Sequence, residues 1–264
     1  MAKIQHDKYY TSEELVKHCM NKIDEVIGFD NISEFIESSA GAGAFIDAIK
    51  DKPFKAFDIL PEHELVEQQD FLKLDLPYKK GRLTGFNPPF GGANLLYRSF
   101  YNKAVNIGDY IAFILPIQLH NVSSKLYQFD LIYSEDLGYH YYSGVKLRCC
   151  FNIYKRPNNG LNPKPNLKLN DITVCRYDNK KYDVFDCDIR ICYWGNSSAG
   201  KVLAPNESYS REYKIKINNN ELRDNIISFF YTVNWHDEIK SISVLQITQQ
   251  DLFKTLKKYI PTIK

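Results

Sequence analysis

The sequence has no long hydrophobic run. None of its 264 residues belongs to a stretch of about 18 or more apolar residues, the length that a helix needs to cross a bilayer. The first ten residues, MAKIQHDKYY, lack the apolar segment of a signal peptide. We therefore expect no membrane partner and a protein that is not secreted. It should be cytoplasmic, or nuclear or in a viral factory if its host is eukaryotic.

Paired cysteines are also absent. No two of the six cysteines have the C-x2-C spacing of a zinc site or of a thioredoxin-like motif. We expect reduced, mostly buried thiols and no metal. The six residues are Cys19, Cys149, Cys150, Cys175, Cys187 and Cys192.

A strong charge of one sign is missing as well. The net charge is only +2, so the chain as a whole lacks the electrostatic signature of a nucleic-acid-binding protein. Residues 157–264 hold 16 Lys and Arg against 12 Asp and Glu, whereas the preceding part has a small negative charge. This asymmetry is a weak indication that the C-terminal part meets a polyanion, because a few surface lysines can produce it.

The composition is typical of a globular protein, and the order of the apolar segments is typical of an α/β fold. Residues are 44% hydrophobic and 25% charged, which excludes a disordered chain. A Thr/Ser cap precedes apolar positions at helical spacing, and short apolar runs then alternate with helical stretches. This rhythm predicts a parallel sheet with crossover helices. Strands are predicted at 31–40, 54–59, 82–86 and 109–116, and helices at 13–27, 43–50 and 94–105.

The end of this first region and the rest of the chain are organised differently. Two apolar runs, 125–133 and 145–156, flank residues 134–144 and predict an antiparallel pair at the sheet edge. A segment rich in proline and asparagine follows and indicates a linker. We expect a catalytic domain at 1–156, the linker at 157–167 and a smaller mixed α+β region at 168–264. That region should contain strands at 183–195 and 210–218 and helices at 221–233 and 248–260.

The tetrapeptide Asn87-Pro88-Pro89-Phe90 follows a predicted strand and suits the activation of an amino nitrogen. An adenine N6 amine is a poor nucleophile, because its lone pair is delocalised into the ring. The Asn87 side-chain oxygen and the Pro88 carbonyl would accept its two N–H groups, while the prolines fix the backbone. Phe90 would stack on the base, flipped out of a duplex. A turn with a buried aromatic explains the tetrapeptide equally well.

Three further segments suit a nucleoside-type cofactor. Small residues in the segment ESSAGAGAF, 37–45, form a predicted strand-to-helix turn where a ligand can approach the backbone, although a tight turn alone would also need glycine. Asp58 ends the next predicted strand, where it can accept both ribose hydroxyls or simply cap the strand. Asp70 could accept the adenine amine and Phe71 pack on its ring, with Asp75 as a rival acid.

In order and spacing these segments resemble class I, S-adenosylmethionine-dependent adenine-N6 DNA methyltransferases of the gamma type, in which the cofactor segment precedes N-P-P-F. The resemblance covers residues 9 to about 155 and includes the N-terminal KYYTSEELV. It implies a Rossmann-like, seven-stranded α/β sheet with helices on both faces, S-adenosylmethionine as the cofactor, and direct methyl transfer. The implied cofactor contacts are Tyr10, Thr11, Glu37, Ser39, Ala40, Gly41, Gly43, Phe45, Asp58, Asp70 and Phe71. The implied catalytic residues are Asn87, Pro88, Pro89 and Phe90.

The resemblance also implies a nucleic-acid partner, DNA in the first place. The predicted edge hairpin carries Tyr139, Tyr141 and Tyr142, and this family often places an aromatic there against the target base. We therefore expect Tyr141 and Tyr142 to bind substrate, although surface tyrosines are common. A partner subunit or a companion endonuclease, as in restriction–modification systems, is not encoded in these motifs.

Residues 168–264 match no pattern that assigns a function, and by position they should help to choose the substrate. Basic and aromatic side chains there could contact phosphates and bases, but an ordinary solvated face fits them as well. The triplet 212–214 also matches the E-x-K element of some nucleases, a pattern that often arises by chance. The basic and aromatic residues are Arg190, Arg211, Lys214, Lys216, Tyr193 and Trp194.

Two other interpretations stay open. N-P-P with a following aromatic also occurs in methyltransferases that act on adenine in RNA or on the glutamine N5 amide of proteins. Phe rather than Tyr at position 90 disfavours glutamine, and the basic C-terminal region favours nucleic acid. A non-catalytic nucleic-acid-binding or scaffold protein with the same fold is the second alternative. The retention of Asn87, Pro88, Pro89 and Asp58 argues against it.

Overall fold

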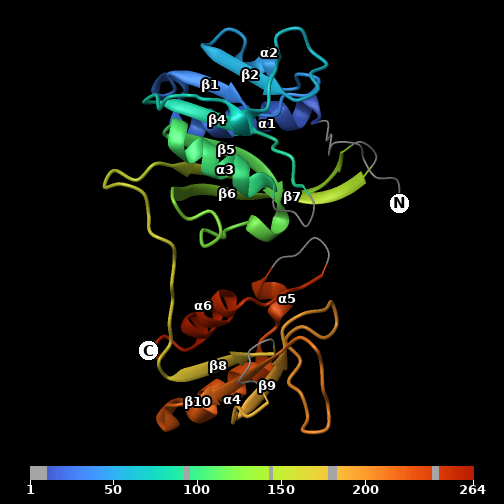
Figure 1. The fold of residues 1–264 in the computed structure, drawn as a ribbon, viewed down its shortest axis with the longest axis vertical. Coiled ribbons are helices and arrows are strands. Elements are labelled where there is room, and N and C mark those ends of the chain that lie inside the picture. The colour runs from blue at the N-terminus through green and yellow to red at the C-terminus, as the bar shows by residue number, and fades with distance from the viewer. Residues whose placement is uncertain (1–10, 92–95, 143–144, 178–182, 240–243) are drawn as a thin grey trace. The chain divides into compact units, whose positions relative to one another are not determined.

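The chain forms two compact units, residues 1–164 and 165–264, in the computed structural model shown in Figure 1. The division falls inside the segment 157–167 that was expected as a linker. All six cysteines lie in the described part of the chain, and none of them forms a disulfide. Among the described residues, no helix combines the length and apolar character that crossing a bilayer requires. The structure describes the chain except for residues 1–10, 92–95, 143–144, 178–182 and 240–243.

The first unit is built on a seven-stranded sheet of order β3-β2-β1-β4-β5-β7-β6. Neighbouring strands from β3 to β5 are parallel, and β7 runs antiparallel to both of its neighbours. The expected α/β sheet with an antiparallel pair at one edge is therefore confirmed. The strands are β1 (Glu34–Glu37), β2 (Phe54–Asp58), β3 (Glu67–Gln68), β4 (Arg82–Phe86), β5 (Tyr110–Pro116), β6 (Asp130–Tyr142) and β7 (Val145–Lys155).

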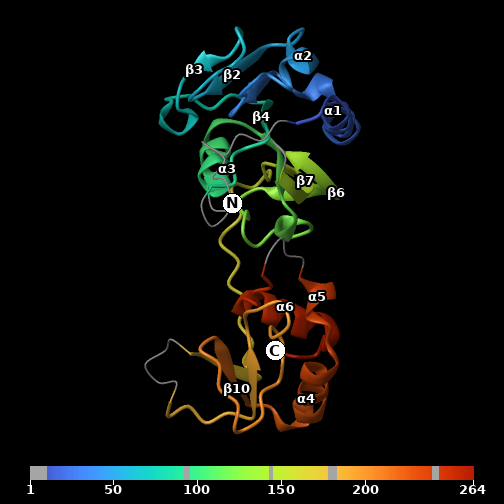
Figure 2. The same ribbon diagram turned by 90° about the vertical axis from the view of Figure 1, so that its right-hand side faces the viewer.

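Helices cover both faces of this sheet, as Figure 2 shows for α1 (Glu13–Ile27) and α3 (Leu96–Ile107). Successive residues of a strand point to opposite faces. Accordingly, Ile153 of β7 belongs to the core cluster that includes the buried side of α1. Its neighbour Tyr154 packs edge-on against Tyr101 of α3, with ring centroids 5.3 Å apart. Both faces are thus buried, as expected for a mostly parallel sheet.

The helix after β1 is shorter than predicted. We expected it over residues 43–50, whereas α2 spans only Ile46–Ile49. The segment before it contains Gly41 with φ +51° and Gly43 with φ +81°. A right-handed helix cannot include these left-handed conformations, so the chain makes a series of turns first.

The edge hairpin is longer than predicted. Residues 134–144 were expected to separate two strands, but β6 continues to Tyr142 and keeps pairing with β7. The register shifts between Asp136 and Gly138, where Gly138 adopts φ +73°. A bulge with glycine in the left-handed region lets a strand absorb an extra residue and continue.

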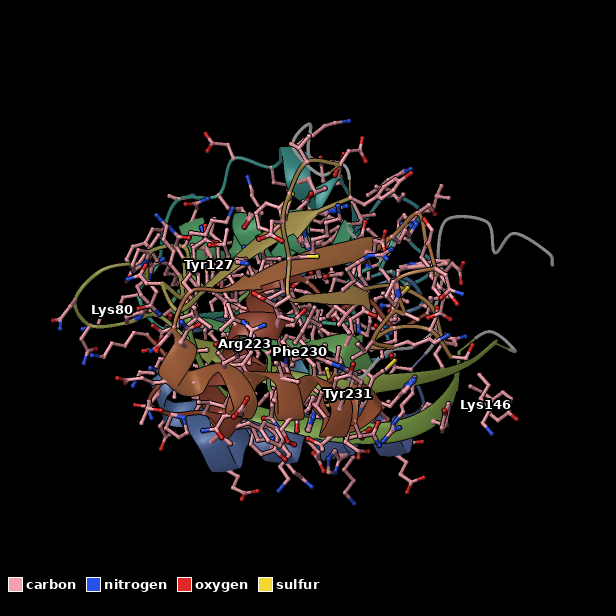
Figure 3. All side chains as sticks on the ribbon, turned by 90° about the horizontal axis from the view of Figure 1, so that it is seen from below. Lys80, Tyr127, Lys146, Arg223, Phe230 and Tyr231 are labelled. Atoms are coloured by element: carbon pink, nitrogen blue, oxygen red, sulfur yellow. The ribbon has the colours of Figure 1, made fainter. Side chains whose placement is uncertain are left out.

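The second unit is the expected smaller α+β region. Three antiparallel strands in the order β8-β10-β9 pack against helices, and Figure 3 labels Arg223, Phe230 and Tyr231 on one of them, α4. The strand β8 was not predicted, and β9 is shorter than the strand predicted at 183–195. The elements are β8 (Ile172–Arg176), β9 (Ile189–Cys192), β10 (Glu212–Ile217), α4 (Arg223–Thr232), α5 (Trp235–Glu238) and α6 (Gln249–Tyr259).

Candidate cofactor and catalytic site

A cavity of about 310 Å3 lies in the first unit, where β1, β2 and β4 end. The strand β1 lies between β2 and β4. After β1 the chain adds β2 and β3 on one side of it, and then crosses over to add β4 and β5 on the other side. Open α/β sheets bind ligands at such a switch point, beyond the carboxyl ends of the strands. The volume falls within the range of about 300–1,000 Å3 that is usual for small-molecule pockets.

The cavity brings together most of the residues that the sequence predicted. Tyr10 lies outside the described residues. Gly43, Pro88 and Phe90 are described but do not line the cavity. The predicted residues that line it are Thr11, Glu37, Ser39, Ala40, Gly41, Phe45, Asp58, Asp70, Phe71, Asn87 and Pro89.

Asn87 forms hydrogen bonds with two segments that are distant from it in the sequence. Its side-chain Nδ2 donates a hydrogen bond to Thr11 Oγ1 at 3.1 Å, just before the start of α1. Ser39 Oγ, in the turn after β1, donates to the Asn87 carbonyl oxygen at 3.0 Å. These two bonds fix both the amide plane and the backbone of Asn87 within the cavity.

Glu37, at the end of β1, is a buried carboxyl group with one unsatisfied oxygen. Its side chain is only 2% exposed, and Ser39 N–H donates to Oε1 at 3.4 Å. Burial is the main reason that the pKa of Glu37 is raised to about 8; backbone hydrogen bonds from Ser39 and Phe86 lower it in part, and the nearby Asp58 makes a smaller upward contribution. Within the described residues, Oε2 has no hydrogen-bond partner. A buried acceptor of this kind is satisfied when a cationic donor enters the cavity.

The raised pKa of Glu37 predicts that the ligand-free protein loses stability as the pH rises. The unfolded state gives up this proton near pH 4.5, whereas the folded state holds it up to about pH 8. Between these values the folded state binds more protons, so the free energy of unfolding should fall with rising pH. Urea unfolding across this range, without cofactor, measures the slope.

Two variants interpret that slope. Glu37→Gln removes the titrating group and should flatten the pH dependence. Glu67→Gln, at an exposed position of β3, should leave it as in the wild type. An identical slope in the Glu37→Gln variant would show that another group is responsible.

Asp58, at the end of β2, accepts one backbone hydrogen bond on each carboxylate oxygen. Gly41 N–H donates to Oδ2 at 2.8 Å, and Leu60 N–H donates to Oδ1 at 2.8 Å. Each oxygen retains further acceptor capacity for a pair of hydroxyl groups. A Cβ built on Gly41 would lie 4.0 Å from Asp58 Oδ2, an ordinary van der Waals distance, so the turn at Gly41 leaves space beside the carboxylate.

A flat apolar wall completes the cavity. Phe71 is 2% exposed and stacks on Phe100 of α3, with ring centroids 5.5 Å apart and an interplanar angle of 23°. Asp70 caps the short turn that carries Phe71, because its Oδ1 accepts from Leu72 N–H at 3.1 Å. The rival acid, Asp75, is exposed and does not line the cavity.

Two expected site residues have structural roles in this conformation. A Cβ on Gly43 would lie 2.7 Å from the ring of His63, so this glycine permits close packing of that side chain rather than the approach of a ligand. Phe90 is 5% exposed and lies in the core cluster that includes Leu15 of α1. Pro88 is buried as well. We had expected Phe90 to stack on the base. In this conformation its side chain is buried in the core instead.

The predicted substrate contacts on the hairpin also lie apart from the cavity lining. Tyr141 is 70% exposed on β6. Tyr142 ends the same strand, and its side chain is outside the described part of the structure. The roles of both residues in substrate binding stay predictions.

Several apolar residues that line the cavity were not predicted from the sequence. Leu96 and Phe100 lie four residues apart on α3 and therefore share one helix face. Ile59 directly follows Asp58 at the end of β2, and Leu72 follows Phe71. The helical spacing after the N-P-P-F motif was a usable signal for the first pair, because that helix starts at the same edge of the sheet.

Most of the basic residues singled out in the second unit have partners within it. Arg190 forms an ion pair with Glu212 at 2.9 Å, and Glu212 is only 2% exposed. Lys216 pairs with Asp186 at 2.7 Å, and Arg211 lies 4.8 Å from the ring centroid of Trp194. The buried, paired Glu212 disfavours a nuclease role for the triplet 212–214. Within the described ranges, no group of three or more His, Cys, Asp or Glu side chains is arranged to hold a metal ion.

Solved structures resemble the chain in the arrangement of the sheet. A candidate RNA methyltransferase from Pyrococcus horikoshii is 13% identical over 59% of this chain and 90% of its own, with a TM-score of 0.46. A candidate class I S-adenosylmethionine-dependent methyltransferase from Listeria monocytogenes is 14% identical over 62% of this chain and 66% of its own, with a TM-score of 0.43. The methyltransferase subunit of a type I restriction–modification system from Streptococcus thermophilus is 12% identical, with a TM-score of 0.41. That match covers 97% of this chain and 59% of the subunit.

No protein-family model and no curated protein sequence matches the chain. The structural likenesses concern the fold alone. The chemistry of the cavity therefore has to follow from the residues of this chain.

Proposed function

We propose that this protein is a class I methyltransferase that moves a methyl group from S-adenosylmethionine to the exocyclic N6 amine of adenine in DNA. The observation that carries the proposal is the hydrogen-bonded junction at Asn87. Thr11 and Ser39 hold the asparagine of the N-P-P-F motif in the same cavity as Glu37 and Asp58. One cavity thus contains an acceptor suited to a conjugated amine and groups suited to a nucleoside cofactor.

The cavity residues fit S-adenosylmethionine in three places. The unsatisfied Oε2 of Glu37 suits the ammonium group of the methionine part. Asp58, with open space beside Gly41, suits the two ribose hydroxyls. The stacked rings of Phe71 and Phe100 offer an apolar wall for the adenine. When bound, this cofactor supplies an electrophilic methyl group.

Asn87 would activate the acceptor amine. Its side-chain oxygen would accept one N–H of the adenine N6 group. Pro88 is buried beside the cavity and does not line it, so its carbonyl would accept the other N–H only once substrate binding exposes it. Both bonds favour a pyramidal nitrogen, whose lone pair then points away from the ring and can form the bond to the methyl carbon. The hydrogen bonds strengthen as the nitrogen gains positive charge, which is the condition for catalysis. As the nitrogen–carbon bond forms, the bond between the sulfonium sulfur and the methyl carbon would break, S-adenosylhomocysteine would leave, and the surplus proton of the methylated amine would pass to solvent.

The experiment that tests the proposal is methyl transfer from radiolabelled S-adenosylmethionine to several acceptors. Duplex DNA, single-stranded DNA, RNA and a protein extract are incubated in parallel, and mass spectrometry identifies the product. N6-methyladenine in DNA supports the proposal. Label found only in RNA or in glutamine side chains would keep the proposed role of Asn87 but would identify a different methyl acceptor. No label, together with no heat of binding for S-adenosylhomocysteine, would favour a non-catalytic scaffold.

A further inference from the structure

The hairpin of β6 and β7 extends past the end of its neighbour in the sheet, as Figure 1 shows. The last residue of β5, Pro116, pairs with Cys149 of β7. Beyond this pair, residues 139–142 and 145–148 continue the ladder with each other. We call this two-stranded extension the arm. Because β5 runs parallel to β4 and β1, the arm projects from the sheet edge that holds the cavity.

Four side chains share one face of the arm. Tyr139 pairs with Arg148, and Tyr141 pairs with Lys146. Directly opposed residues, and residues two apart on one strand, lie on the same face of a sheet. Lys146 Nζ lies 5.0 Å from the ring centroid of Tyr139, and Arg148 Cζ lies 5.8 Å from it. We call these four residues the arm face.

The opposite face of the arm belongs to the core. His140 pairs with Leu147, and Leu147 packs against the cluster that includes the buried side of α1. The arm face therefore points to the side on which α3 covers the sheet. On the arm itself this side is accessible, because Tyr139, Tyr141 and Lys146 are exposed.

The bulge at Gly138 places the tyrosines on this face. Tyr133, before the bulge, and Leu137, the extra residue that the ladder skips, pack against the α1 side of the core. Without an extra residue, Tyr139 and Tyr141 would continue that alternation and face the same side. The register shift at Gly138 reverses the alternation, and nothing lies within 4 Å of a Cβ built there. The backbone conformation of one glycine thus turns two large aromatic side chains outward.

The arm face combines exposed rings with positive charge. Tyr139 is 62% exposed and Tyr141 is 70% exposed. Lys146 is exposed, whereas Arg148 also forms an ion pair with Asp136 at 2.6 Å. Aromatic rings beside cations suit unpaired nucleic acid, since bases stack on the rings and phosphates meet the cations. A duplex keeps the faces of its bases stacked inside, so it cannot use the rings in this way.

We propose that the arm face binds a single-stranded segment of the polynucleotide substrate, with bases stacked on Tyr139 and Tyr141 and phosphates at Lys146 and Arg148. This inference rests on the proposed function for its substrate class. It assigns to the arm a role outside the reacting centre, namely the selection of unpaired over paired nucleic acid.

The test measures the affinity of the full chain for a fluorescent single-stranded oligodeoxynucleotide and for the matching duplex. Tyr139→Ala with Tyr141→Ala should weaken single-strand binding by at least about 30-fold, because each stacked base contributes about five- to one-hundred-fold. Duplex binding should change by less than about threefold. Tyr139→Phe with Tyr141→Phe keeps both rings and should retain the wild-type affinity.

Three controls make the result specific. Tyr231→Ala removes a tyrosine of α4 that is 69% exposed and should bind as the wild type does. Lys146→Gln should lower the slope of log affinity against log salt by about 0.7, the loss of one phosphate contact. Affinity for S-adenosylhomocysteine should be unchanged in the paired alanine variant, which shows that the cavity is intact.

The outcomes separate this inference from the proposed function. Unchanged single-strand affinity in the paired alanine variant, or an equal loss for duplex, would overturn the role of the arm. Absence of single-strand binding by the wild type would overturn it as well. Wild-type single-strand affinity together with no methyl transfer to any acceptor would overturn the proposed function and leave the role of the arm standing.

Discussion

Replacing Asn87 by alanine should lower the rate of methyl transfer by a factor of about 10³ or more, because it removes a fixed acceptor from the developing positive charge on the amine. Affinity for S-adenosylhomocysteine should stay within about threefold of the wild type, since Glu37 and Asp58 are untouched. Single-turnover methylation and calorimetry measure the two quantities separately.

The matched control for this prediction is Asn102→Ala, at an exposed position of α3. It should leave both quantities at their wild-type values. Full methylation by the Asn87→Ala variant would exclude Asn87 from the reacting centre. A parallel loss of cofactor affinity would assign it to cofactor binding instead.

Replacing Asp58 by alanine should weaken the binding of S-adenosylhomocysteine by about 100-fold, because a charged acceptor contributes about 1.5–3 kcal/mol per hydrogen bond. The same change frees the N–H groups of Gly41 and Leu60, which loosens the turns on both sides of the ribose position. Asp58→Asn keeps the shape and one acceptor oxygen, so its loss of affinity should be intermediate. Calorimetry with the purified variants measures both.

Asp47→Asn provides the control, because Asp47 is an exposed carboxylate that pairs with Lys50 and does not line the cavity. Its cofactor affinity should equal that of the wild type. If Asp58→Ala binds S-adenosylhomocysteine as tightly as the wild type does, Asp58 does not bind the ribose. Its role would then be the two hydrogen bonds that hold the turns at Gly41 and Leu60.

Local sequence patterns predicted the parts of the site that depend on short-range geometry. Glu37 and Asp58 end buried strands, and parallel strands end at one edge, so their proximity could be foreseen. The same holds for Asn87, which directly follows β4. Gly41 was predicted to allow a ligand near the backbone; its φ of +51° lies in the region that favours glycine, and the ligand contact stays a prediction.

Other features depend on packing between segments far apart in the chain. Whether Phe90 turns toward a ligand or into the core is decided by α1, which begins far earlier in the chain, at Glu13, and fills that side of the sheet. Gly43 is constrained by His63, which no local pattern connects to it. The extent of β6 depended on the bulge at Gly138, whose effect appears only once the strand has its partner. Sequence periodicity alone contains none of these contacts.

The bulge at Gly138 also separates two kinds of change that evolution can make in this protein. Beyond it, the ladder of the arm continues without β5, so substitutions there leave the hydrogen bonding between β5 and β7 intact. Deleting one residue at the bulge would turn the outward rings inward, and restoring it would turn them out again. The proposed binding surface can therefore diversify by single-codon steps while the strands that position Glu37, Asp58 and Asn87 stay unchanged.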